Sequence, residues 1–174
     1  MLPVKKPVDE LRAIGAPREL VEWVRKLPPE EATRRAWIDV TRPDWMPYIA
    51  VLRGITNDAI VRATCACVID LGGAALESPE GARIADVLRG GRETIVTAED
   101  ALDDLRRTML AYGDRPDAPG WFPWCKHALE LGRAARRGNP LIGVALVLRT
   151  LVGQGGRRAS SDLIARFRDR LLLA

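Results

Sequence analysis

The sequence predicts an all-α protein, a single multi-helix bundle of about nine or ten helices. Ala, Leu and Arg dominate the composition, and only two Phe and two Tyr accompany the five Trp, a balance that favours helix over sheet. Residues 57–72 are apolar on nearly every side. We therefore expect them to form a central helix that other helices surround.

Length and composition fit one domain over residues 1–174, with residues 1–16 as an N-terminal arm or one short helix. The hydrophobic share of 47% and the charged share of 29% are typical of globular proteins. Residues 1–6 are followed by Pro7 rather than by the apolar core of a signal sequence, and the three Cys are an odd number. Both observations favour the reducing cytoplasm.

Prolines and capping residues divide the first half of the chain. After Pro17, apolar residues recur at helical spacing as far as Leu27, and Pro28-Pro29 ends this helix and starts the next. Asp44 can cap a third helix, and Thr56-Asn57 can cap the central one.

Similar signals divide the second half. Ser78-Pro79 starts a short helix that ends at Gly90-Gly91, and residues 97–100 resemble a capping box that opens a helix to Tyr112. Pro and Gly predict a long loop over residues 113–120. The remaining helices are expected at residues 121–137, from Asn139-Pro140 to Gly153, and from about Ser160 onward.

One segment, residues 141–148, is also compatible with a buried strand. Its Ile and Val suit either element, and periodicity does not separate the two. A strand without a partner would leave its backbone groups unpaired, so we expect a helix. The run is well short of the roughly 20 residues that span a bilayer, and we expect no transmembrane segment.

Positive charge is concentrated in the C-terminal quarter. The net charge of +4 divides into +7 for residues 133–174 and −3 for the rest. These arginines suit a phosphate-binding face, an acidic protein partner or a solvated surface. They lie on three segments with a single aromatic residue, Phe167, among them, which argues against nucleic acid. The nine are Arg133, Arg136, Arg137, Arg149, Arg157, Arg158, Arg166, Arg168 and Arg170, and the first three with Arg157 and Arg158 are the candidate contacts.

Three cysteines and the single histidine are the candidate chemical groups. Cys65, Cys67, Cys125 and His127 could supply four zinc ligands. Residues i and i+2 point about 200° apart on a helix, so Cys65 and Cys67 do not readily share a metal, and we expect buried thiols and no cofactor. Cys125 and His127 are the only route to a His-activated nucleophile, and no third group accompanies them, so we expect no enzyme.

Two tryptophans follow the predicted loop. Trp121 and Trp124 either present at least one exposed ring as an anchor for a partner or cover the core at the start of a helix. Both alternatives remain open at this point.

A pattern of packing residues resembles a known family. A Trp, then an Arg-x-Asp-Trp-Met element, then an Ala-Cys-Ala-Cys-like helix is similar to a family of helical bacterial proteins described as immunity proteins of polymorphic toxin systems. The turn at residues 89–93 is also similar, and the match covers residues 36 to about 112. The positions that carry it, which we expect to be structural, are Trp37, Arg42, Asp44, Trp45, Cys65 and Cys67.

The chain departs from that family in two places. Ile38-Asp39-Val40 stands where the family often has Cys, and residues 121–124 and the Arg-rich end replace its Ala-rich helices. The resemblance implies a non-catalytic, cytoplasmic protein that binds and occludes a toxin domain. The alternative is a helical nucleic-acid-binding protein that uses the C-terminal arginines.

Overall fold

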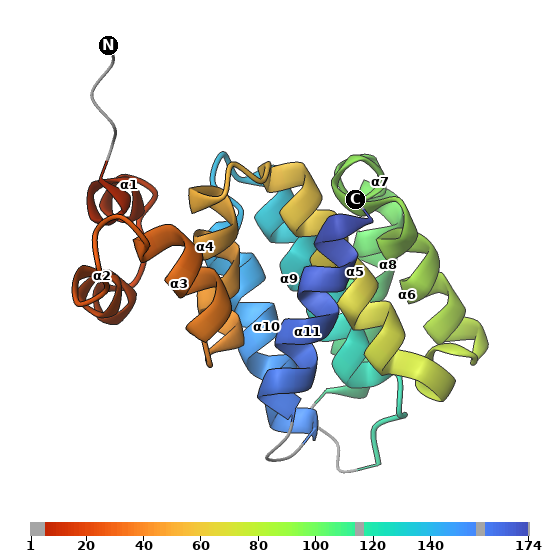
Figure 1. Cartoon of the computed structure of the whole chain (residues 1–174). Coiled ribbons are helices and arrows are strands. Elements are labelled where there is room, and N and C mark those ends of the chain that lie inside the picture. Colours follow the sequence, from red (N-terminus) through yellow and green to blue (C-terminus); the bar gives the residue numbers. More distant parts are fainter. Residues whose placement is uncertain (1–5, 114–116, 156–158, 174) are drawn as a thin grey trace.

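The computed structural model describes residues 6–113, 117–155 and 159–173, which Figure 1 shows as a bundle of helices. Within these residues the chain has eleven α-helices and no strand, so the all-α prediction is confirmed. The α-helices are α1 (Pro7–Ala13), α2 (Arg18–Arg25), α3 (Ala32–Asp39), α4 (Met46–Leu52), α5 (Asn57–Gly72), α6 (Pro79–Arg89), α7 (Gly91–Thr97), α8 (Glu99–Tyr112), α9 (Phe122–Arg136), α10 (Leu141–Gly155) and α11 (Ala159–Leu172), with the 3-10 helices η1 (Pro43–Trp45) and η2 (Gly73–Leu76).

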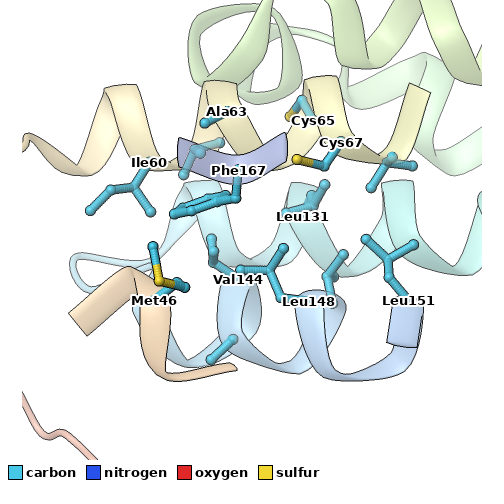
Figure 2. Close-up of a cluster of buried hydrophobic side chains, with 14 of the residues drawn as sticks. Met46, Ile60, Ala63, Cys65, Cys67, Leu131, Val144, Leu148, Leu151 and Phe167 are labelled. Atoms are coloured by element: carbon cyan, nitrogen blue, oxygen red, sulfur yellow. The ribbon is translucent and has the colours of Figure 1, made fainter. Parts of the chain in front are cut away.

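Helix α5 is the predicted central helix. The Thr56 hydroxyl caps it by accepting a hydrogen bond of 3.3 Å from the Ala59 backbone N–H. Helices α6, α7, α9, α10 and α11 pack around it, and α11 covers it most extensively. In Figure 2, the buried ring of Phe167 from α11 lies between Ile60 of α5 and Val144 of α10. One cluster of buried side chains includes all three residues and extends to Leu11 in α1.

Residues 141–148 are helical, as expected, and belong to α10, which packs closely against α9. A Cβ atom built at Gly143 would lie 2.5 Å from the Cβ of Ala134, so only glycine allows this approach. Asn139 caps α10: its Oδ1 accepts a hydrogen bond of 3.1 Å from the Leu141 N–H. Its Nδ2 donates a hydrogen bond of 3.0 Å to the Ile14 carbonyl, which ties α10 to the end of α1.

One local expectation needs correction, and one open alternative is decided. Residues 97–100 do not form a capping box, because Thr97 is the last residue of α7, an unexpected helix, and Ala98 makes no side-chain cap. Gly91 has a φ of +61°, a conformation that favours glycine and lets the chain turn between α6 and α7. Of the two alternatives for residues 1–16, an arm or one short helix, the described part agrees with the helix: Pro7–Ala13 form α1, whose Leu11 is fully buried, and residues 1–5 lie outside the described part.

One continuous helical stretch, Asn57–Leu76, is long and apolar enough to cross a membrane by length and composition alone. Half of its most apolar window is buried inside the bundle. The central helix of an all-α protein has the same composition when other helices pack around it, as they do around α5.

Candidate protein-binding surface

The cysteines are buried thiols. Burial raises the pKa of Cys65 and of Cys67 to about 12, and that of Cys125 to about 11. Cys65 and Cys67 leave α5 in different directions, as Figure 2 shows. Among the described residues, no group of three or more His, Cys, Asp or Glu side chains could hold a metal ion.

Cys125 and His127 point to different neighbours of α9. The Cys125 Sγ donates to the Leu105 carbonyl of α8 at 3.6 Å. His127 is 6% exposed, and its Nδ1 lies 3.4 Å from the Thr150 hydroxyl of α10. The Trp124 ring packs edge-on against the imidazole, with centroids 5.8 Å apart. The structure therefore does not bring this thiol and imidazole together as a nucleophile and its base.

Three of the family-like positions form a compact cluster at η1. The Arg42 guanidinium makes two hydrogen bonds to the Asp44 carboxylate, of 2.6 and 3.2 Å. It also lies over the Trp45 ring, 4.6 Å from the centroid, and the other side of the cluster contains Trp23, whose ring is 5.4 Å from that of Trp45. The carboxylate raises the pKa of Arg42. Because η1 packs against α10, this cluster fixes the loop before α4 to the bundle.

Trp37 is part of a second structural cluster. Its ring lies near two guanidinium groups, with the Cζ of Arg53 at 5.3 Å and the Cζ of Arg168 at 5.4 Å from the centroid. Arg168 also donates hydrogen bonds to the carbonyls of Trp37 and, at 3.4 Å, Ile38. These carbonyls lie in the last turn of α3, where they have no intrahelical donor. Burial lowers the pKa of Arg168.

The C-terminal arginines do not all face solvent together. Arg170 makes a bidentate ion pair with Asp70 of α5, with hydrogen bonds of 2.7 and 2.9 Å, so it joins Arg168 in a structural role. Arg136 lies 3.6 Å from Glu99, and Arg133 lies 3.5 Å from Glu130. The remaining described members, all exposed, are Arg137, Arg149 and Arg166, while Arg157 and Arg158 lie outside the described residues.

Trp121 is not an exposed anchor. Its side chain is 5% exposed, and its ring packs edge-on against Tyr112 at a centroid distance of 5.5 Å. Trp124 is half-buried beside His127. Of the two alternatives, the rings cover the core at the start of α9.

The outward face of α10 carries apolar side chains at helical spacing. Ile142 is 58% exposed and Leu146 is 47% exposed, and the exposed Arg149 follows on the same face. Next to Leu146 a groove of about 470 Å³ lies between α9 and α10. The groove is lined by Met109, Pro123, Lys126, His127, Leu129, Glu130, Arg133, Leu146, Val147 and Thr150. We call this groove, together with Ile142 and Arg149, the α9–α10 surface.

Sequence reasoning missed Ile142 and Leu146 as surface residues. Their signal was present, because residues 141–148 contain no polar residue, although a helix at the edge of a bundle normally has one polar face. That signal becomes informative only when the structure shows which face of α10 is exposed. The arginine prediction found Arg133 on this surface but not the adjoining apolar residues.

A larger pocket, of about 560 Å³, lies between α5, α7 and α9. Its charged lining residues have both signs: Asp58, Arg62 and Arg136. Arg136 lies within ion-pair distance of Glu99, so this pocket does not present a uniform charge.

The fold and these clusters define a class, the all-α helical bundles, but no narrower group. The chain matches no protein-family model, no curated protein and no solved structure.

Proposed function

We propose that the protein is a non-catalytic, cytoplasmic protein-binding module that contacts its partner through the α9–α10 surface. The observation that supports this most directly is the exposure of Ile142 and Leu146 beside cationic side chains. Exposed apolar residues with a polar rim are typical of protein interaction sites.

Within this proposal, the partner is a toxin domain that the protein binds and occludes, as the resemblance of residues 36–112 suggests. The residues that carry the resemblance stabilise the fold: Arg42, Asp44 and Trp45 contact one another at η1, and Trp37 is contacted by Arg168. The binding residues would then lie outside the matched region, on α9 and α10. Such a division lets one scaffold serve different partners.

Nucleic-acid binding is the second candidate, supported by the charge of +7 in residues 133–174. Four of those nine arginines contact the protein itself, which reduces the charge available to a phosphate backbone: Arg133, Arg136, Arg168 and Arg170.

Affinity purification from native extract tests both proposals. The tagged full-length chain is washed at low and high salt, bound protein and nucleic acid are identified, and any recovered protein is purified and bound again. We expect a salt-resistant protein partner that Leu146→Glu loses and Leu172→Glu, at a leucine 84% exposed on α11, retains. Nucleic acid that dissociates with salt, without such a protein, would replace the first proposal with the second.

A further inference from the structure

We infer that the α9–α10 surface accepts an acidic amphipathic helix of the protein partner. This inference rests on the proposed function and adds the chemistry of the bound segment. It depends on the shape of the groove, on its charge and on the absence of a strand edge from the described part of the chain.

Two exposed apolar residues of α10 and one threonine form a line along the helix. Ile142 and Leu146 are one turn apart, and Thr150 lies one turn further at the groove, so the line spans about 12 Å at 1.5 Å per residue. Leu129 and Val147 form the buried floor. A partner helix with apolar residues at positions i, i+4 and i+7 matches this line.

The cationic side chains determine the charge of the occupant. Lys126 and Arg133 line the groove on α9, and Arg149 is exposed on α10. Glu130 is the only acidic residue among the described groove residues, and Arg133 lies 3.5 Å from it. The net charge is therefore positive, and acidic residues flanking the apolar anchors of a partner would be complementary to it.

A helix fits better than an extended segment. Peptides that bind as strands pair with an exposed sheet edge, and the described part of this chain contains no strand. Helices α9 and α10 are joined by a short link and approach closely at Gly143 and Ala134. The groove between two such neighbours accommodates the side-chain ridge of a third helix.

Titration of a labelled peptide with the full-length protein tests the inference. The probe is a stapled helical peptide of about 18 residues, with Leu at i, i+4 and i+7 and Glu on its other faces. Its controls are a scrambled peptide of the same composition and a peptide with Lys in place of Glu. Fluorescence anisotropy should show binding of the acidic helix and weaker binding of both controls.

Variants identify the surface. Leu146→Glu should weaken binding at least about tenfold, whereas Leu172→Glu should leave it unchanged. Arg149→Glu should weaken binding of the acidic peptide and strengthen binding of the Lys peptide, a reversal that loss of folding would not produce. Unchanged binding in Leu146→Glu, or equal binding of the scrambled peptide, would overturn the inference.

A competition experiment separates the inference from the proposed function. A partner that depends on Leu146 and is displaced by the acidic peptide supports both. A partner that depends on Leu146 but is not displaced supports the binding role and overturns the acidic-helix inference. Failure to recover any Leu146-dependent protein, together with no peptide binding, contradicts both.

Discussion

The guanidinium group of Arg168 packs on the indole ring of Trp37 and donates a hydrogen bond to the carbonyl of the same residue, 131 positions earlier in the chain. An arginine near the end of a helix satisfies carbonyls that the helix itself leaves unpaired. This contact fixes α3 to α11 and so connects an N-terminal helix with the C-terminal helix of the bundle.

Arg168→Ala should therefore lower the free energy of unfolding by about 1–2 kcal/mol. The loss is smaller than for a fully buried arginine, because the guanidinium group is partly exposed. Arg166→Ala, at an exposed position of the same helix, is the matched control and should change stability little. Urea denaturation measures both values. Equal losses in the two variants would show that the contact with α3 contributes nothing.

Gly143→Ala should destabilise the protein by about 1–3 kcal/mol, because the new Cβ would lie 2.5 Å from the Ala134 Cβ. Gly153→Ala on the same helix has no atom within 4 Å of the new Cβ and should raise stability by about 0.5–1 kcal/mol. Thermal unfolding of the two variants should give shifts of opposite sign. A shift to lower temperature in both would contradict the explanation by close packing.

Asn139→Ala should lower the free energy of unfolding by about 1 kcal/mol, since it removes the cap of α10 and the hydrogen bond to the Ile14 carbonyl. Asn139→Asp keeps the acceptor for the Leu141 N–H and loses only the donor. We expect its stability, measured by chemical denaturation, to lie between those of the wild type and Asn139→Ala. If Asn139→Asp equals Asn139→Ala, the cap has no measurable effect.

The buried thiols predict a decrease in stability at high pH. The folded-state pKa values of Cys65 and Cys67 are about 12, and that of Cys125 is about 11, all above the ordinary value of about 9. Below pH 8 the thiols are protonated in both states and contribute no pH dependence. From pH 9 upward the unfolded chain loses these protons first, so the free energy of unfolding falls as the pH rises toward 11–12.

Denaturation between pH 7 and 10.5 measures this effect, and Cys125→Ala, which removes one of the three thiols, should show a shallower decrease. A thiol reagent at pH 8 should label the folded protein far more slowly than the denatured protein. Rapid labelling of the folded protein would mean that the cysteines are not buried in solution.

Local signals were sufficient for elements whose ends are set by nearby residues. Thr56 caps α5 as predicted, and Ser78 caps α6 where that helix was predicted to start. Each accepts a hydrogen bond from an N–H three positions later. Helix α7 was missed because Gly90-Gly91 is typical of a helix end, and the sequence does not show that the chain, after turning at Gly91 with its positive φ, continues directly into a new helix.

The candidate surface could be predicted only in part, because exposure is a property of tertiary packing. Trp121 is buried because Tyr112, a residue of the preceding helix, packs on its ring. Ile142 is 58% exposed, whereas the next residue, Gly143, faces Ala134 of α9. Neither relationship is contained in the spacing of residues along one helix.

The hydrogen bonds from Asn139 to Ile14 and from Arg168 to the end of α3 connect residues 125 or more positions apart. Contacts of such long sequence separation form late, because a long loop must close before they stabilise the chain. During synthesis, α1 and α3 would emerge from the ribosome well before the side chains that complete their ends. The arrival of α10 and α11 therefore completes the ends of these N-terminal helices.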